Sequence, residues 1–360
     1  MKRQVTIGGV VIVISVATAA AYGIVQSRWF GSTAPQSAGP GGTTTVATPQ
    51  ASAVQGSPGE RASGPMRQPV TVAQAPAPQT QPAAPPQAAA KAAIPCENPN
   101  AMGVARVVEI DTAGGPGFGS QHFKTYDFLR DHEVVLTFDD GPWLNNTQAV
   151  LKALADQCLR ATFFPIGKHA TYYPEILKQV VAAGHTIGNH TWSHADLEAV
   201  IKKGGPDAAK EEIEKGASAV HMMAGAPTAP FFRFPDLRHP PEMLTYLGER
   251  NIASFSTDID SWDFKIKKPD ELTKSLMGKL NKLGKAIILM HDFQKVTSIA
   301  LPQILGQLQK NGFKVVHMVP RSALTTIAQY DEAVLKENKL PTLTGNKPTE
   351  SVVRTISGEP

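Results

Sequence analysis

From residue 134 to residue 318, short apolar and β-branched segments alternate with longer segments in which apolar residues recur every three or four positions. The short segments are typical of buried strands, and the longer ones are typical of amphipathic helices. The predicted strands are residues 134–138, 161–165, 186–190, 231–235, 253–257, 286–291 and 313–318. The predicted helices are residues 147–157, 174–183, 206–222, 240–249, 269–283 and 298–309.

This alternation predicts an α/β domain, which we place at residues 94–330, with helices packed on a parallel sheet. Strands separated by helices in this way favour a sheet that is closed, or nearly closed, into a distorted (β/α)7 barrel. An open, doubly wound sheet is the alternative.

The first thirty residues have the pattern of a targeting segment. Lys2 and Arg3 precede an uncharged run that is apolar from Val5 and continues to Ser27. This run is longer than the core of a usual signal peptide and about long enough to span a bilayer. We therefore expect residues 1–30 to be a signal anchor or a signal peptide. Residues 5–27 would anchor the chain in the inner membrane, and the remainder would be exported to the periplasmic or extracellular face.

The segments on either side of the predicted domain are polar. Residues 31–93 are rich in Ala, Pro and Gln and contain no aromatic residue, so we expect a disordered linker. Residues 331–360 are expected to form a polar tail. The two cysteines, Cys96 and Cys158, could form a disulfide in an exported protein or could remain free thiols, and the sequence leaves both open.

Charge and motifs exclude some classes of partner. The net charge is +4, with 35 Lys and Arg against 31 Asp and Glu, which is too mild to predict a nucleic-acid partner. The chain has no Gly-rich phosphate loop of either the dinucleotide or the Walker type, so we expect no nucleotide cofactor.

Polar residues gather where the predicted strands end. They are Asp139 and Asp140 after the first strand, His190 at the end of the third, Arg233 in the fourth, Asp260 and Asp263 after the fifth, and His291 at the end of the sixth. In a parallel barrel these ends open on one face, where active sites are built. The sequence therefore predicts one active site made from residues far apart in the chain.

A metal site is predicted within this group. His190 and His194 are spaced i and i+4, which can place two imidazoles on one side of a helical turn. With the carboxylate of Asp140 they form a His-His-Asp set suited to zinc or a similar divalent ion. Because such an ion lowers the pKa of its bound water, the adjacent Asp139 would be left as a free base.

Over roughly residues 130–320 the chain resembles the polysaccharide deacetylase family, whose domain is called NodB homology or carbohydrate esterase family 4. Residues 137–141 read TFDDG and residues 190–194 read HTWSH, which match two family motifs intact. Residues 233–235 read RFP but are followed by Asp236 instead of an aromatic residue. Residues 260–264, DSWDF, and 289–291, LMH, are similar to two further motifs.

The resemblance implies that Asp140, His190 and His194 hold one divalent ion. Zinc is the first choice, and cobalt, nickel or another divalent ion is the alternative. It also implies that Asp139 deprotonates the metal-bound water, which attacks the acetyl carbonyl, and that His291 protonates the leaving amine.

Four other residues take supporting roles by the same resemblance. Arg233 would orient Asp139, and Asp263 would hold the imidazole of His291. The backbone N–H of Asp236 would stabilise the oxyanion. Trp262 could contact the substrate, although an aromatic residue near a barrel mouth can equally serve packing.

The function implied is a metal-dependent hydrolase that removes acetyl groups, most readily N-acetyl, from an extracytoplasmic polysaccharide or oligosaccharide. A catalytically silent glycan-binding module of the same fold is one alternative. A non-haem iron oxygenase is another, since two histidines and a carboxylate also suit Fe(II). The loop at residues 234–240 departs from the family pattern, and we expect substrate preference to be decided there.

Overall fold

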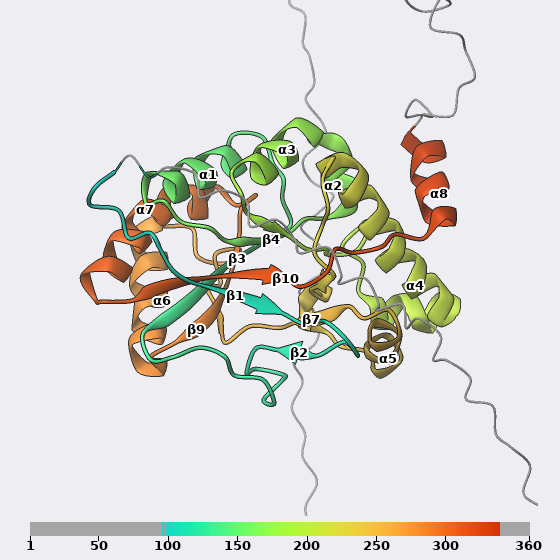
Figure 1. Ribbon diagram of the computed structural model, residues 1–360, viewed down its shortest axis with the longest axis horizontal. Coiled ribbons are helices and arrows are strands. Elements are labelled where there is room, and N and C mark those ends of the chain that lie inside the picture. The colour runs from blue at the N-terminus through green and yellow to red at the C-terminus, as the bar shows by residue number, and fades with distance from the viewer. Residues whose placement is uncertain (1–95, 97, 339–360) are drawn as a thin grey trace, which may run out of the picture. The chain divides into compact units, whose positions relative to one another are not determined.

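The structure, a computed structural model, describes residue 96 and residues 98–338 (Figure 1). The expected anchor at residues 1–30, the expected linker at 31–93 and the end of the expected tail lie outside the described residues. Within the described part, no helix combines the length and the apolar character that crossing a membrane requires.

The larger sheet is parallel throughout and has β3 (Glu133–Asp139) at its centre. Strand β3 pairs along its length with β9 (Ala286–His291), and it also pairs with β10 (Lys314–Pro320) and β4 (Thr162–Phe164). The remaining strands of this sheet are β1 (Val104–Ile110), β5 (Thr186–Ile187) and β8 (Ile259–Asp260). Every residue of β3 is buried, as expected for a parallel strand covered on both faces.

A smaller parallel sheet contains β2 (Gly117–Phe118), β6 (Phe231–Phe232) and β7 (Ala253–Phe255). A single parallel bridge between Asn189 and Phe232 links it to the segment after β5. On its other side the chain passes from β7 into β8, where the N–H of Asp258 donates to the carbonyl of Ile287 at 2.9 Å. The predicted α/β fold with a parallel sheet is confirmed, and its strands are divided between two sheets joined at these two places.

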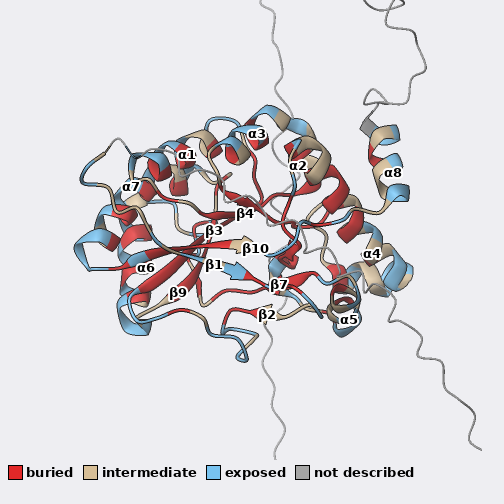
Figure 2. Ribbon diagram, in the orientation of Figure 1, coloured by how far each residue is buried: buried red, intermediate tan, exposed pale blue. Residues whose placement is uncertain are grey.

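The helices pack beside one another in the order α6, α7, α1, α3, α4, α5, with α2 also against α4 (Figure 1). Their bounds are α1 (Asn146–Asp156), α2 (Gly167–Tyr172), α3 (Pro174–Ala182), α4 (Leu197–Ala224), α5 (Pro241–Glu249), α6 (Pro269–Leu283), α7 (Lys295–Lys310) and α8 (Ala328–Asn338). Figure 2 shows buried residues along the strands and on the inner faces of the helices. The largest core cluster joins β3 and β9 to α1, α6 and α7.

Three helices differ from the sequence-based expectation: α2 and α8 were not predicted, and α4 begins earlier than predicted. The predicted helix at residues 206–222 is the second part of α4, which Pro206 begins after Gly205, with φ 80, interrupts the helix. The first part of α4, which begins at Leu197, was not predicted. Residues 331–338, expected to belong to a polar tail, lie in helix α8, where Val334 is buried in a cluster with Trp192. Because Val334 is the one buried residue among the described side chains of α8, the sequence of this helix shows little apolar periodicity.

Cys96 and Cys158 form a disulfide, with Cα atoms 5.6 Å apart. This settles the choice that the sequence left open between a bridge and two free thiols. The bond ties the start of the described chain to the residue that follows the end of α1 by two positions.

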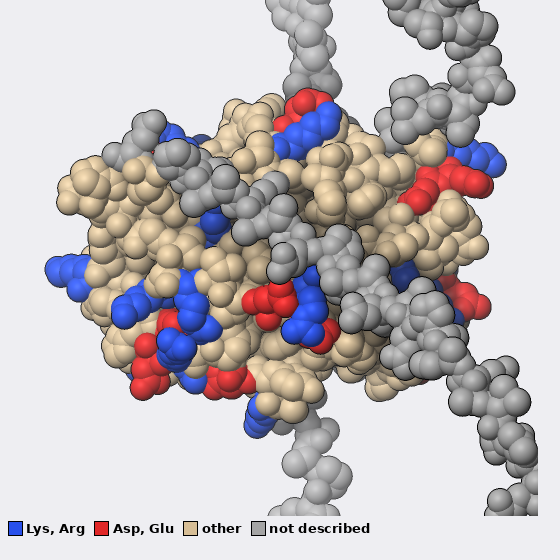
Figure 3. Space-filling model, viewed as in Figure 1, with Lys and Arg blue, Asp and Glu red and all other residues tan. Residues whose placement is uncertain are grey.

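Charged side chains of both signs are interspersed on the face seen in Figure 3. This distribution agrees with the small net charge of +4. On that face, and among the described residues, no broad basic field of the kind used to bind nucleic acid is seen.

Candidate metal centre and active site

The site is built where β3 and β9 end side by side. The register of this parallel pair places Asp139 directly beside His291. Asp140 follows with φ 72, a left-handed conformation that turns the chain at once into the loop before α1. Because of this turn, the two adjacent carboxylates face the same centre instead of opposite sides of a strand.

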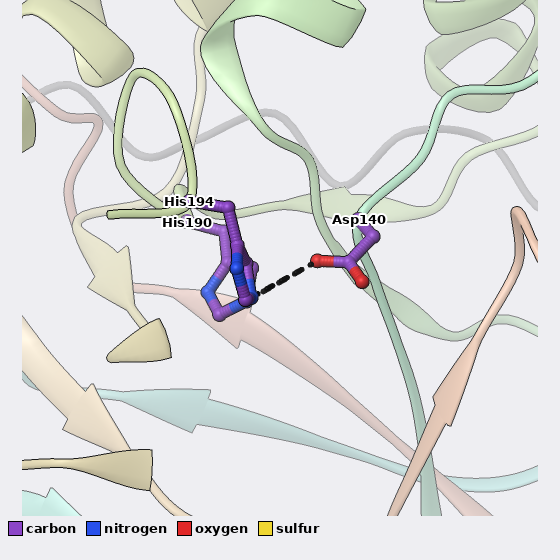
Figure 4. A group of neighbouring side chains, drawn as sticks. All are labelled: Asp140, His190 and His194. Carbon is purple, nitrogen blue, oxygen red and sulfur yellow. Dashed lines mark ion pairs between the residues drawn. The ribbon is translucent and has the colours of Figure 1, made fainter. Parts of the chain in front are cut away.

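Asp140, His190 and His194 form the candidate metal centre. One ligand atom from each lies within 4.8 Å of the others. Oδ1 of Asp140 is 3.5 Å from Nε2 of His190 and 3.5 Å from Nε2 of His194. Figure 4 shows both imidazoles turned toward the carboxylate. Asp140 and His190 are buried and His194 is half-buried, which leaves one side of the group open to solvent.

The polar atoms of this centre fit a divalent cation. Oδ1 of Asp140 is buried and accepts no hydrogen bond, an arrangement that is costly unless a cation binds there. Nδ1 of His190 is 2.7 Å from the carbonyl of Arg233, so it carries the ring proton and leaves the lone pair of Nε2 facing Asp140. A carboxylate and two imidazole nitrogens of this kind are ligands that zinc prefers.

The pKa values of these groups agree with such a centre. Burial lowers the pKa of His190 and so favours the neutral imidazole that a metal requires. Burial alone would raise the pKa of Asp140, but the neighbouring imidazoles of His291, His194 and His190 outweigh it and hold the pKa below its usual value. Asp140 is therefore ionised at neutral pH.

Asp139 lies beside this centre and is held by Arg233. Its Oδ1 accepts a hydrogen bond of 2.7 Å from Nη1 of Arg233, while its Oδ2 is 4.0 Å from Nε2 of His190. Arg233 is completely buried, and its guanidinium lies over the ring of Phe164 at 4.4 Å. Its other hydrogen bonds go to Oγ1 of Thr137 at 2.7 Å and to the carbonyls of Phe255 at 3.1 Å and Ser256 at 2.9 Å. The fixed guanidinium of Arg233 thus binds Oδ1 of Asp139 and leaves Oδ2 facing the candidate metal centre.

His291 is held by Asp263 on the other side. Nδ1 of His291 is 2.6 Å from Oδ1 of Asp263, and the backbone N–H of His291 donates to Oδ2 at 2.7 Å. Oγ1 of Thr297 also donates to Oδ2 of this wholly buried carboxylate. Burial would lower the pKa of His291, but the charge and hydrogen bond of Asp263, with the charges of Asp140 and Asp139, raise it to about 10. The raised pKa favours the protonated ring of His291, whose Nε2 lies 3.9 Å from Oδ2 of Asp140.

The remaining predicted residues lie at the edge of the site. Asp236 is exposed, with φ 55, in the turn formed by η1 (Pro235–Leu237). Trp262 is 49% exposed, and its ring faces the ammonium groups of Lys265 and Lys279 at 4.6 and 5.0 Å. The aromatic rings that contact His291 are those of Phe264, at 5.8 Å between centroids, and Phe293, at 6.1 Å. Asp260, the last residue of β8, accepts a hydrogen bond of 2.9 Å from the N–H of Trp262 and so caps the turn after its strand.

Asp292 is a residue of the site that the sequence did not single out. It is buried, follows His291 directly, and contacts the backbone of Gly141 in the turn after Asp140. Burial and the nearby charge of Asp140 raise its pKa to about 7, although a hydrogen bond from Thr147 opposes them. Its position next to a predicted catalytic histidine was the only signal available in the sequence.

Residues 129–253 match the family described as polysaccharide deacetylase. A peptidoglycan-N-acetylglucosamine deacetylase of Bacillus cereus is 33% identical over 189 residues, which cover 51% of this chain and 66% of that protein. A chitooligosaccharide deacetylase of Azorhizobium caulinodans is 31% identical over 163 residues, which cover 44% of this chain and 73% of that protein.

Among solved structures, a peptidoglycan deacetylase of Bdellovibrio bacteriovorus matches with a TM-score of 0.54 and 28% sequence identity. The match covers 62% of this chain and 61% of that chain. The chain thus spans just under two thirds of the length of both the Bacillus cereus relative and this solved structure.

Proposed function

Because this chain belongs to the polysaccharide deacetylase family, we propose that it removes acetyl groups, N-acetyl in the first place, from an acetylated polysaccharide or oligosaccharide. The proposed substrate class is a glycan containing N-acetylglucosamine, since relatives are named for peptidoglycan and for chito-oligosaccharides. The observation that carries the proposal is the meeting of Asp140, His190 and His194 at one point, with Asp139 and His291 on either side.

Asp140, His190 and His194 would hold one divalent ion, which we propose is zinc, with cobalt or nickel as alternatives. Such an ion would supply a Lewis acid that polarises the acetyl carbonyl and makes water more acidic. The buried Oδ1 of Asp140, which has no hydrogen-bond donor, supports this assignment.

Asp139 is proposed as the general base. The hydrogen bond from Arg233 to its Oδ1 fixes the carboxylate and leaves Oδ2 to accept a proton from the attacking water. Arg233 is therefore a positioning residue, because its guanidinium acts through Asp139.

His291 is proposed as the general acid. Asp263 holds Nδ1, so the proton on Nε2 is the one that His291 can give to the departing amine. The raised pKa of His291 keeps this proton in place at neutral pH, before the amine forms.

Asp236 and Trp262 are proposed to contact the reacting group and the sugar. The backbone N–H of Asp236 follows the proline of the third motif and would stabilise the oxyanion. Because the backbone supplies this donor, the change from an aromatic side chain to Asp236 does not remove it. The exposure of Trp262 supports a contact with substrate, and Phe264 lies nearer to the proposed acid.

We further propose that the enzyme acts outside the cytoplasm, tethered by an anchor at residues 5–27 and a linker at residues 31–93. The disulfide between Cys96 and Cys158 supports export, since such bonds persist in oxidising compartments. The two linked parallel sheets would then correspond to the wall of a distorted (β/α)7 barrel that opens toward the substrate.

Acetate release from chito-oligosaccharides and from peptidoglycan tests the function. We expect release that a chelator abolishes and added zinc restores. The Asp139→Asn variant should lower the rate about 100-fold or more, the usual contribution of a general base. Asp156→Asn, the same change in the exposed ion pair with Lys152 on α1, is the matched control and should leave the rate unchanged.

Two results would contradict the proposal. An unchanged rate in Asp139→Asn would remove Asp139 as the base. Glycan binding by the zinc-loaded protein without release of acetate would favour the glycan-binding module of the same fold.

A further inference from the structure

Asp292 connects two strand ends that carry different parts of the site. It follows His291 at the end of β9, and its Oδ1 accepts a hydrogen bond of 3.1 Å from the N–H of Gly141, the residue after Asp140. Its Oδ2 accepts a hydrogen bond of 2.5 Å from Oγ1 of Thr147 in the first turn of α1. Both oxygens of this buried carboxylate therefore accept hydrogen bonds from the segment that follows β3.

The contact with Thr147 extends to the turn itself. Oγ1 of Thr147 accepts a hydrogen bond of 2.7 Å from the N–H of Trp143, and its O–H donates to Asp292. Asp292 is thus bonded to Gly141 directly and to Trp143 through one hydroxyl. These bonds hold the loop from residue 140 to the start of α1 at two points.

The other hydrogen bonds of the Asp140–Gly141 backbone are made with the end of β4 and the residues after it. The carbonyl of Phe164 accepts from the N–H of Asp140, the N–H of Ile166 donates to the carbonyl of Gly141, and the ring of His169 contacts the carbonyl of Asp140. These partners are Phe164, the last residue of β4, and two residues that follow it in the chain. Among the described residues, the bond to Asp292 is the one hydrogen bond from the Asp140–Gly141 backbone to the strand end that bears His291.

The fit between Asp292 and the turn is close. A Cβ atom added to Gly141 would lie 2.1 Å from Oδ2 of Asp292 and 2.4 Å from Oδ1. The carboxylate therefore lies directly against the backbone of Gly141, in space that a side chain at position 141 would fill. Such contact fixes the position of the turn as well as its hydrogen bonding.

We propose that Asp292 is a positioning residue that fixes the turn bearing Asp140 against the strand end bearing His291. It would set the distance between a metal ligand and the proton donor, although it contacts neither the metal nor the substrate. This inference rests on the proposed function, since it takes Asp140 as a ligand and His291 as the acid.

The variants Asp292→Ala, Asp292→Asn and Thr147→Val test the inference. Alanine removes both bonds. Asparagine can still accept from Gly141, but its amide would face Thr147 and leave the hydroxyl of Thr147 without an acceptor. Valine at position 147 removes only the bond through the hydroxyl. The matched control is Glu133→Gln, because Glu133 is a buried carboxylate paired with Arg106 at the opposite end of β3.

Two quantities are measured for each variant that folds by circular dichroism: the Kd for Zn²⁺ by competition with a chromogenic chelator, and kcat and KM for a chito-oligosaccharide. Asp292→Ala should weaken Zn²⁺ binding about 10- to 100-fold, the usual effect of losing a partner that orients a ligand. Its kcat should fall while KM changes little. Asp292→Asn and Thr147→Val should give intermediate values, and Glu133→Gln should keep the wild-type Kd even where it lowers thermal stability.

Wild-type Zn²⁺ affinity and kcat in all three test variants would overturn the inference, as would an equal loss of affinity in Glu133→Gln. If Asp292→Ala does not fold, Asp292→Asn and Thr147→Val decide the matter alone. A wild-type protein that binds no Zn²⁺ and releases no acetate would instead refute the proposed function. The experiment therefore distinguishes a wrong function for the protein from a wrong role for Asp292.

Discussion

Arg233 offers the sharpest test of how the site is held together, because it is a completely buried cation whose partners are all known. Arg233→Met keeps a side chain of similar length and removes the guanidinium. The change leaves the carboxylate of Asp139 buried without its counter-ion, and it removes the donor from Thr137 and from the carbonyls of Phe255 and Ser256. Removing one partner of a buried ion pair costs about 3–5 kcal/mol, and we expect a loss of unfolding free energy in this range.

Urea unfolding at pH 7, followed by circular dichroism, measures this loss. A second variant, Arg233→Met with Asp139→Asn, removes the uncompensated charge and should be more stable than Arg233→Met alone. The matched control is Arg238→Met, because Arg238 pairs with Asp196 near the surface and such pairs contribute about 1 kcal/mol or less. The reasoning is refuted if Arg233→Met loses less than about 1 kcal/mol, or if the Asp139→Asn change brings no recovery in the Arg233→Met background.

Three further predictions concern regions outside the site. Burial and the nearby Arg160 lower the pKa of His185 to about 3 and of His317 to about 4. The pKa of a histidine in the unfolded chain is about 6.5, so below that pH the unfolded chain binds protons that the folded protein does not. The free energy of unfolding is therefore at its full value above pH 6.5 and falls as the pH is lowered toward 4, by about 3 kcal/mol for His317. His317→Gln should flatten this loss in urea titrations across that range. Ending the chain at residue 327 removes α8 and should expose Trp192, which a red shift of tryptophan fluorescence would reveal. Reducing the disulfide, which closes a loop of 62 residues, should cost about 4 kcal/mol of unfolding free energy, measured with and without reductant.

Most strands and helices of the domain could be predicted because they have a regular pattern of apolar residues, but strand β1 and helices α2 and α8 were not predicted. Strand β3, for example, is buried on both faces and reads as a run of apolar and β-branched residues from Val134 to Phe138. Strands β2, β5, β6 and β8 have two residues each, too few to show any period. Of these, β5 and β6 fell within predicted strands, and β2 and β8 did not. The division of the strands between two sheets therefore depends on pairings that no local sequence pattern could reveal.

The candidate metal centre could be predicted from its residue types, since a carboxylate and two imidazoles are ligands that a divalent ion prefers. The helical turn expected between the two histidines was wrong, because residues 190–194 are not helical and Thr191 and His194 have φ 65 and 58. The contacts around the centre could not be predicted. Asp292 acquires its partners only because β3 and β9 pair in a register that places Gly141 beside it. In the same way, Phe264 rather than Trp262 contacts His291, since Trp262 has φ 62 and its ring faces two lysines.

The different environments of Asp139 and Asp140 explain how two adjacent, identical residues can take different roles. Asp139 ends a regular strand, which points its side chain toward the buried guanidinium of Arg233. Asp140 lies in a left-handed conformation, which turns its side chain toward His190 and His194 and leaves Oδ1 without a donor. One carboxylate is thus neutralised by the protein and the other is left for a cation. This division arises from a single backbone turn, so any change that straightens the turn should impair both roles at once.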